Sequence, residues 1–218
     1  MADRYDLIVF DWDGTLMDSA AAIVAAILAA SRDLNLSEPS EERARHVIGL
    51  GLSEALRHAV PDLAESNYPL MVERYRFHSL SRDHELTLFP GAAAMIAQLA
   101  AMGRSLAVAT GKSRLGLGRA LKQTGLGPYF HTTRCADECF SKPHPAMLEE
   151  IMDELGIAKH RTLMVGDTTY DLQMARNAGV ESLAVAFGAH PRAALEAEAP
   201  VDVLATPADL AAWLRDNA

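Results

Sequence analysis

Residues 5–15, YDLIVFDWDGT, decide the fold class of this 218-residue chain. The first six are mainly aliphatic or aromatic, which is typical of a short buried strand in a parallel sheet. This run stops at Asp11 and Asp13, and Gly14 then allows the chain to turn. Because α/β proteins place their sites where such strands end, we expect both carboxylates to face one small cavity at the carboxyl edge of a sheet.

Two carboxylates in one cavity repel each other unless a hard cation lies between them. Mg²⁺ is the usual cation for carboxylate, carbonyl and water ligands. Taken alone, the segment is also compatible with an acidic turn at the end of a strand. The segment therefore predicts a magnesium site if other polar groups reach the same edge.

Three further motifs place polar side chains at strand ends or before helices. The runs LAVA and LMVG end at Thr110 and Asp167, and Asp171 follows the second acid by four residues. Lys142 lies in a stiff proline-flanked turn, SKPHP, just before a predicted helix. Four such elements in this order indicate a single site for chemistry.

Hydrophobic periodicity divides the chain into two kinds of segment. Between residues 18 and 82 the pattern is helical, with predicted helices at 20–34, 42–47, 53–59 and 64–81. Elsewhere strands and helices alternate, with predicted strands at 5–11, 106–110, 131–134, 162–166, 182–186 and 201–204. The helices between them are predicted at 92–102, 115–124, 146–155, 171–178 and 208–215. This alternation indicates a parallel sheet with helices on both faces.

The four motifs resemble those of the haloacid dehalogenase-like hydrolase superfamily, most closely its phosphoglycolate-phosphatase-like branch with a helical cap. The matching segments are FDWDGTLMDS at 10–19, TGK at 110–112, KPHP at 142–145 and GDTTYD at 166–171. Trp12 and Gly111 depart from the commoner residues at their positions, and we expect them to reshape the pocket. The resemblance implies an α/β fold, a Rossmann-like parallel sheet flanked by helices (residues 1–17 and 83–218), with an inserted all-helical cap domain (residues 18–82).

The resemblance also implies a role for each motif side chain. Asp11 is expected to be the nucleophile that attacks phosphorus, and Asp13 the general acid and base. Mg²⁺ is expected to bind Asp11, Asp167 and the backbone carbonyl of Asp13. Thr110 and Lys142 are expected to stabilise the charge of the transferring phosphoryl group.

Two residues of these motifs have alternative interpretations. We expect Asp171 to hold a metal-bound water or to orient Lys142, and the alternative is a helix N-terminal acid. For Lys112 we prefer a solvated surface position.

Substrate binding is expected from Gly111 and from the helical cap. The segment with Gly49 and Gly51 is expected to close over the substrate as a cap loop. Arg57 is our candidate for an anionic part of the substrate, among the cap arginines Arg43, Arg45, Arg57, Arg74 and Arg76. Surface arginines on helices are usually only solvated, which is the alternative for each of them.

Composition excludes several classes of partner. The formal net charge of −9 argues against nucleic acid. The first six residues lack a signal-peptide pattern, and the apolar run at 20–30 is shorter than the roughly 20 residues that span a bilayer. Two cysteines, Cys135 and Cys139, indicate reduced thiols rather than a metal site. We therefore expect a cytoplasmic monomer or homodimer that acts on a small phosphorylated metabolite without nucleic acid or membrane partners.

The function that these observations predict is a Mg²⁺-dependent phosphatase acting through an aspartyl-phosphate. Its substrate is expected to be a small phosphate monoester, phosphoglycolate-like or a sugar phosphate. A phosphomutase of the β-phosphoglucomutase type uses the same motifs and stays open as an alternative. A phospho-accepting signalling domain is the non-enzymatic alternative, although such a domain would be shorter and lack the cap.

Overall fold

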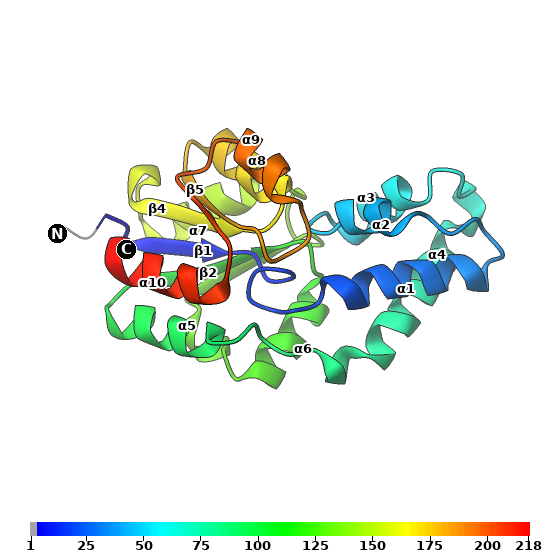
Figure 1. The fold of residues 1–218 in the computed structure, drawn as a ribbon, viewed down its shortest axis with the longest axis horizontal. Coiled ribbons are helices and arrows are strands. Elements are labelled where there is room, and N and C mark those ends of the chain that lie inside the picture. Colours follow the sequence, from blue (N-terminus) through cyan, green and yellow to red (C-terminus); the bar gives the residue numbers. More distant parts are fainter. Residues whose placement is uncertain (1–3) are drawn as a thin grey trace.

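The computed structural model describes residues 4–218, so the expected start of the core at residue 1 and the first three of the six residues considered for a signal peptide lie outside the described residues. Six parallel strands form one sheet in the order β3-β2-β1-β4-β5-β6 (Figure 1). Their bounds are β1 Leu7–Phe10, β2 Ser105–Thr110, β3 Thr132–Cys135, β4 Thr162–Gly166, β5 Glu181–Val185 and β6 Val203–Leu204. The expected parallel sheet is thus confirmed, with β1 at its centre beside β2 and β4.

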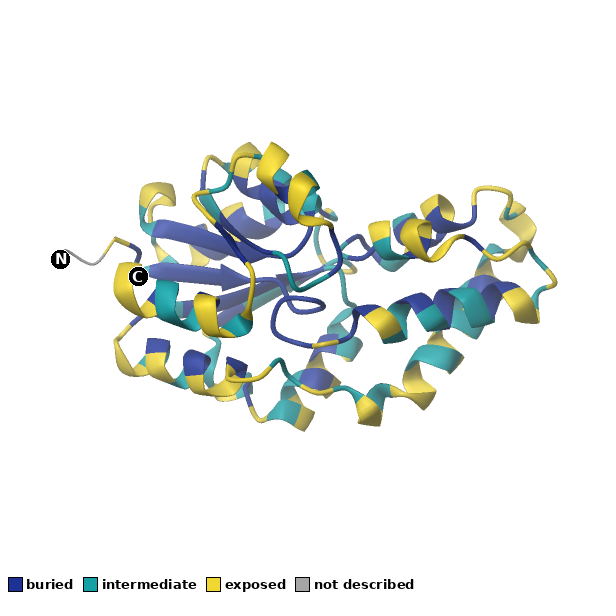
Figure 2. Ribbon diagram, in the orientation of Figure 1, coloured by how far each residue is buried: buried dark blue, intermediate teal, exposed yellow. Residues whose placement is uncertain are grey.

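Helices cover both faces of the sheet because successive strand side chains point to opposite faces. Ile8 and Phe10 of β1 pack in one buried cluster with side chains of α5, α6 and α10. Leu7 and Val9 pack in a second cluster with α7 and α8. The bounds are α5 Ala92–Ala101, α6 Arg114–Thr124, α7 Ala146–Leu155, α8 Thr169–Ala178, α9 Arg192–Ala197 and α10 Pro207–Asn217. The strands are accordingly almost wholly buried (Figure 2).

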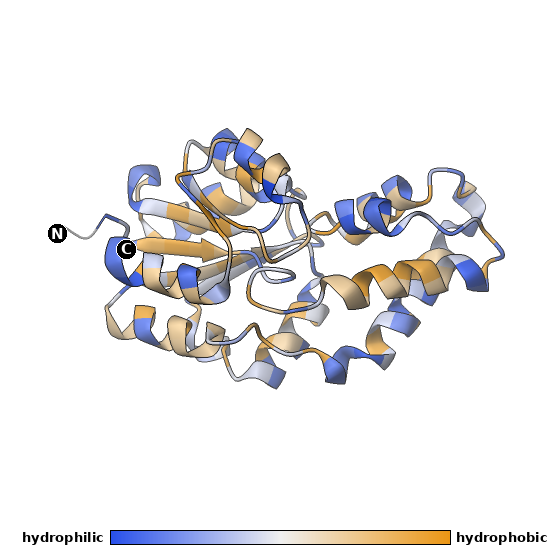
Figure 3. Cartoon of the chain, viewed as in Figure 1, coloured by the Kyte–Doolittle hydropathy of each residue, from blue (hydrophilic) through white to orange (hydrophobic). Residues whose placement is uncertain are grey.

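Four more helices form a separate layer at one end of the sheet (Figure 1). They are α1 Ala20–Asp33, α2 Glu41–His46, α3 Leu52–Ala59 and α4 Tyr68–Ser81. Their apolar side chains share a third buried cluster, to which α1 contributes Ala20, Val24 and Ile27 at helical spacing. Figure 3 shows that most of α1 is apolar. We refer to the four helices together as the helical layer.

The chain enters and leaves the helical layer through two adjacent segments. The backbone N–H of Asp18 donates to Thr87 at 2.9 Å, and that of Phe89 donates to Leu16 at 2.9 Å. Met17 and Leu88 form an antiparallel bridge between the two segments. This geometry supports the expected division into residues 1–17, 18–82 and 83–218, which stays a prediction.

Several predicted element bounds differ from the observed ones. The helix predicted at 64–81 begins only at Tyr68, after a 3-10 turn at Glu65–Asn67, because Pro69 lies in its first turn and favours a helix start there. The helix predicted from residue 171 begins at Thr169, since Thr168 caps it. Helix α9 is absent from the prediction. Three further 3-10 turns occur, at Asp83–Glu85, Gly127–Tyr129 and Lys159–Arg161.

Trp12 lies in the core rather than in a pocket. Its side chain is fully buried in the cluster beneath α5 and α6, and its ring meets that of Phe130 edge-on, with centroids 6.4 Å apart. The expectation that Trp12 reshapes the pocket stays a prediction, and from this position any such effect would be indirect. Among residues 4–218, none of the helices has both the length and the apolar character needed to cross a bilayer.

Candidate active site

The motif side chains gather at the carboxyl edge of the sheet. Asp11 follows β1, Thr110 ends β2 and Asp167 follows β4, so neighbouring parallel strands bring them together. The six motif residues are each at most 8% exposed: Asp11, Asp13, Thr110, Lys142, Asp167 and Asp171. Buried charges need partners, so their contacts define the site.

Lys142 connects two of the acids. Its Nζ lies 2.6 Å from Asp11 Oδ1 and 2.6 Å from Asp171 Oδ1, and the lysine is fully buried. Burial alone would lower the pKa of Lys142, but the two carboxylates more than offset it and raise that pKa above its usual range. Lys142 is therefore a fixed ammonium at the centre of the site.

Three carboxylates, of Asp11, Asp167 and Asp171, lie close enough to share one cation. One oxygen from each falls within 4.8 Å of the others. Within residues 4–218, Asp11 Oδ2 is a buried oxygen that has no hydrogen-bond partner. Burial, followed by the charge of neighbouring carboxylates, raises the pKa of Asp167 well above its usual range. An excess of buried negative charge together with an unpartnered carboxylate oxygen fits a divalent metal ion.

Asp167 is held rigidly by its neighbours. Thr15 Oγ1 donates to Asp167 Oδ1 at 2.9 Å, and the backbone N–H of Ala189 donates to Oδ2 at 2.7 Å. Gly14 has φ +85°, and a Cβ atom there would lie 2.1 Å from Asp167 Oδ2. A Cβ atom at Gly188 would lie 2.3 Å from the same oxygen. Both glycines are therefore needed for the close approach of backbone to carboxylate.

Asp171 contacts both the start of α8 and Lys142. The backbone N–H and the hydroxyl of Thr168 donate to Asp171 Oδ2 at 3.1 and 2.7 Å, which completes a capping box at the start of α8. The other carboxylate oxygen accepts from Lys142. The helix start thus fixes the orientation of the lysine through Asp171.

Lys112 does not occupy the solvated position that we preferred from sequence, and that expectation is wrong. Its Nζ lies 2.9 Å from both carboxylate oxygens of Asp13, and its side chain is 19% exposed. Ser19 Oγ also donates to Asp13 Oδ1, at 2.7 Å. A half-buried ammonium needs a counter-charge, and Asp13 supplies it.

The Asp13 side chain has its own partners outside the acid cluster. Its described partners are Lys112 and Ser19, and it is not one of the three clustered carboxylates. The expected contribution of Asp13 to the metal site was its backbone carbonyl, which stays a prediction.

The cap loop with Gly49 and Gly51 packs directly on core loops. The backbone N–H of Gly51 donates to Ser141 Oγ at 2.9 Å. A Cβ atom at Gly111 would lie 2.4 Å from the carbonyl oxygen of Leu50 and 2.6 Å from that of Gly49. The glycine at position 111 therefore permits this contact between the helical layer and the core.

Arg57 lies apart from these groups. Its guanidinium lies 3.7 Å from Glu65 and 5.1 Å from the ring centroid of Tyr68, and its side chain is 60% exposed. These contacts are all within the helical layer and its 3-10 turn. Thus the structure does not bring Arg57 to the motif residues.

Three aromatic side chains that sequence reasoning missed join the helical layer to the core. His46 of α2 stacks on His190 with centroids 4.8 Å apart, and Tyr170 lies edge-on to His190 at 5.3 Å. His190 Nδ1 accepts from the backbone N–H of Thr169, so the proton is on Nε2, which donates to the carbonyl of His46. Burial lowers the pKa of His190. Tyr170 lies in the GDTTYD motif, but His46 and His190 are 144 positions apart and lie in none of the motifs, so the sequence alone carries no signal for their stack.

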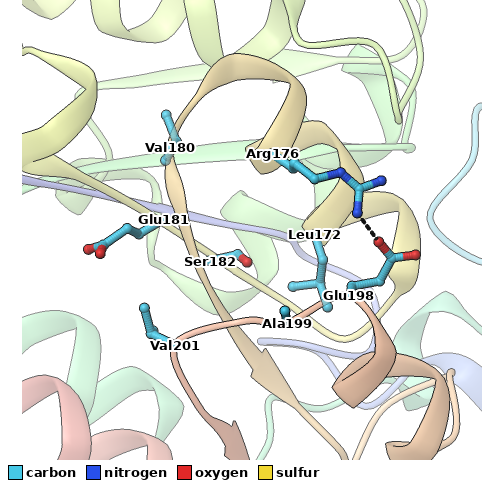
Figure 4. A pocket seen from close by; sticks show the side chains of 8 residues that line it. All are labelled: Leu172, Arg176, Val180, Glu181, Ser182, Glu198, Ala199 and Val201. Carbon is cyan, nitrogen blue, oxygen red and sulfur yellow. Dashed lines mark hydrogen bonds and ion pairs between the residues drawn. The ribbon is translucent and has the colours of Figure 1, made fainter.

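A surface cavity of about 350 Å³ lies at the other end of the sheet, between α8 and the start of β5 (Figure 4). Arg176 and Glu198 form an ion pair of 2.6 Å at one side of it, and Glu181 pairs with Arg4. Its charged side chains are thus already paired, so it offers less chemistry than the acid cluster.

Comparisons with known proteins agree with this geometry. The sequence model of the haloacid dehalogenase-like hydrolase family matches residues 8–185. The probable phosphatase IndB of Dickeya dadantii is 35% identical over 206 residues, which are 92% of this chain and 89% of the relative. A phosphoglycolate phosphatase of Pectobacterium atrosepticum is 33% identical and covers 93% and 89% of the two chains. A solved structure of a predicted phosphoglycolate phosphatase from Haemophilus somnus superposes with a TM-score of 0.85 at 25% identity, covering 96% and 98%.

Proposed function

This chain belongs to the haloacid dehalogenase-like hydrolase family, and from that premise we propose that it is a Mg²⁺-dependent phosphatase of small phosphate monoesters. The substrate class is phosphoglycolate-like or a sugar phosphate, and the reaction proceeds through an aspartyl-phosphate. The observation that supports this most strongly is the pairing at Asp11. One of its oxygens is held by the Lys142 ammonium, and the other is buried without a partner among the described residues.

The carboxylate of Asp11 is the proposed nucleophile. Its attack forms an oxygen–phosphorus bond and breaks the bond to the leaving oxygen, to which Asp13 gives a proton. Asp13 then takes a proton from water as the water oxygen attacks phosphorus, which breaks the bond between phosphorus and Asp11, releases inorganic phosphate and returns Asp11 to a free carboxylate. Splitting hydrolysis into two displacements lowers the barrier of each.

Lys142 and Thr110 stabilise the charge that spreads over the phosphoryl oxygens. Lys142 is fixed by Asp11 and Asp171, so it needs no reorganisation during the reaction. Asp11 and Asp167, with the backbone carbonyl of Asp13, are the proposed Mg²⁺ ligands. When bound, Mg²⁺ supplies a positive charge that offsets the carboxylates and polarises the phosphoryl group.

We also propose that residues 18–82 act as a lid over a core of residues 1–17 and 83–218. The two adjacent crossings near Met17 and Leu88 support a hinge there. The glycine contacts between the cap loop and Gly111 support closure over the substrate. The cytoplasmic location and the monomeric or homodimeric state stay predictions.

The test is a turnover assay of the purified chain with Mg²⁺ and a panel of phosphate monoesters that includes 2-phosphoglycolate and hexose phosphates. We expect release of inorganic phosphate that stops when EDTA is in excess and returns when Mg²⁺ is restored. Conversion of a hexose phosphate to its isomer without phosphate release would favour the mutase. Full turnover in excess EDTA would contradict the metal dependence.

A further inference from the structure

Lys112 is the charged group of the site whose role the proposed mechanism leaves open. Its Nζ contacts both oxygens of Asp13 at 2.9 Å, at the position where the mechanism places the leaving group. Lys142, by contrast, contacts Asp11 and Asp171. The site therefore holds two ammonium groups with different neighbours.

Asp13 does not depend on Lys112 for its position. Ser19 Oγ donates to Asp13 Oδ1 at 2.7 Å, and residues 13 and 17 form a backbone bridge that fixes the turn. If Asp13 turns one oxygen toward a leaving group, Ser19 can still hold the other. Lys112 then loses part of its contact with oxygen, and a half-buried ammonium is costly without an anion.

The ammonium also lies at the boundary between the core and the helical layer. Gly111, the preceding residue, packs so closely on the carbonyl groups of Gly49 and Leu50 that a Cβ atom would not fit there. Partly buried Tyr75 of α4 interacts electrostatically with both Lys112 and Asp13. A leaving group that reaches Asp13 must therefore lie beside Lys112, within the space that the helical layer covers.

We propose that Lys112 is a specificity-determining residue whose ammonium binds a second anionic group on the leaving-group side of the substrate. That group is a carboxylate or a phosphate, and this inference rests on the proposed phosphatase function. The bound anion replaces one oxygen of Asp13 as partner of Lys112 and leaves Asp13 free to face the leaving oxygen. Esters with a neutral leaving group lack this exchange and are poorer substrates.

The first test compares matched substrates that differ in one group. 2-Phosphoglycolate carries a carboxylate where 2-hydroxyethyl phosphate carries a neutral hydroxymethyl group, and pyrophosphate supplies a phosphate as the second anion. We expect the wild type to prefer an anionic substrate in kcat/KM. Lys112→Met should lower that preference by about 30-fold, as expected for one charge-assisted contact. Which anionic substrate loses more identifies the carboxylate or the phosphate as the ligand.

Two further variants and a control make the comparison specific. Lys112→Gln retains a hydrogen-bond donor for Asp13 without the charge and should lose the preference, whereas Lys112→Arg should retain most of it. Lys122→Met removes an exposed lysine from α6 and should leave the preference unchanged. If Lys112→Met and Lys112→Gln lower the kcat/KM of charged and neutral substrates by the same factor, Lys112 acts only through Asp13 and the inference is overturned.

A binding measurement separates this inference from the proposed function. Phosphonoacetate and 2-hydroxyethylphosphonate form a matched pair without a cleavable ester, and titration calorimetry with Mg²⁺ gives their affinities. We expect tighter binding of phosphonoacetate by the wild type and a smaller difference in Lys112→Met. Equal affinities in the wild type would overturn the role of Lys112. Absence of turnover with every ester would instead contradict the phosphatase, and the binding comparison would still decide the role of Lys112.

Discussion

The carboxyl edge of the sheet and the helical layer differ in how firmly their polar side chains are held. At the edge, Asp11, Lys142 and Asp171 form a continuous buried chain of ion pairs at 2.6 Å. In the helical layer, Arg57 is mostly exposed, and its ion pair with Glu65 is 3.7 Å long. Close burial fixes the geometry that phosphoryl chemistry requires, whereas exposed pairs contribute little and can rearrange.

The two regions also differ in how much space surrounds their residues. At the edge, a single methyl group at Gly14 or Gly188 would collide with Asp167 Oδ2. In the helical layer, α4 exposes Leu70, Phe77 and Leu80 to solvent. The comparison predicts that substitutions at the edge disable the reaction, whereas substitutions of exposed side chains in the helical layer have small effects.

The largest effect is expected from Asp11→Asn. The variant removes the nucleophile, so kcat should fall by about 10⁴-fold or more. Asp18→Asn, at an exposed acid seven residues away, is the matched control and should change kcat by less than about 3-fold. Circular dichroism of both variants checks the fold. Retention of even a tenth of the activity in Asp11→Asn would remove Asp11 as nucleophile.

A smaller effect is expected from Gly14→Ala. The added Cβ would lie 2.1 Å from Asp167 Oδ2, and φ at this position is +85°, so Asp167 must move. We expect Mg²⁺ binding to weaken by about 10- to 100-fold, together with a loss of about 1–3 kcal/mol in the free energy of unfolding.

Gly118→Ala is the control for this substitution because nothing lies within 4 Å of the added atom in α6. It should leave Mg²⁺ affinity unchanged and raise the free energy of unfolding by up to about 1 kcal/mol. Equal Mg²⁺ affinities of Gly14→Ala and wild type would show that the edge tolerates more movement than its packing indicates.

The affinity for Mg²⁺ is expected to change about tenfold between pH 6 and pH 8. Burial, and after it the charge of Asp171, raise the pKa of Asp11 from an ordinary value of 3.8 to about 7, although Lys142 acts in the opposite direction. The folded, metal-free protein then holds a proton that the unfolded chain releases, so its stability should fall as pH rises from 4 to 7.

Mg²⁺ competes with that proton, so its affinity should rise about fivefold from pH 6 to pH 7, reach about tenfold at pH 8 and then level off. Titration calorimetry in two buffers of different ionisation enthalpy would show proton release at pH 6 and little at pH 8. Equal Mg²⁺ affinities at pH 6 and pH 8 without proton release would mean that the acid cluster is fully ionised before the cation binds.

The smallest effect is expected from Arg57→Ala. Because its described contacts lie within the helical layer, kcat/KM should change by less than about 3-fold for 2-phosphoglycolate and for p-nitrophenyl phosphate alike. Gly51→Val is the informative counterpart, since the added side chain would meet Ser141 and Ala136 of the core. We expect it to change the ratio between the two substrates. A strong, substrate-selective loss in Arg57→Ala would place that arginine over the site after all.

The sequence predicted the fold and the buried edge because both depend on local patterns. Short apolar runs that end in acids, a lysine in a rigid turn and a helix predicted to begin at Asp171 each depend on a few neighbouring residues. The parallel sheet then brings Asp11 and Asp167 together without further information. The capping box also explains why Asp171 could be expected both as a helix-starting acid and as a partner of Lys142.

What the sequence did not predict depends on contacts between distant segments. From the sequence, Lys112 is expected to be a surface lysine, but the fold brings its ammonium to 2.9 Å from Asp13. The stack of His46 on His190 joins residues 144 positions apart and has no sequence pattern. Helix α9 is only six residues long, too short for a clear hydrophobic period.

The central claim is that Asp11 becomes covalently phosphorylated, and trapping that intermediate tests it most directly. Borohydride added during turnover reduces an aspartyl-phosphate to homoserine, which peptide mass spectrometry assigns to a position. We predict homoserine at residue 11 in the wild type with Mg²⁺ and substrate, and none in Asp11→Asn or in excess EDTA. Homoserine at residue 13, 167 or 171 instead would contradict the account.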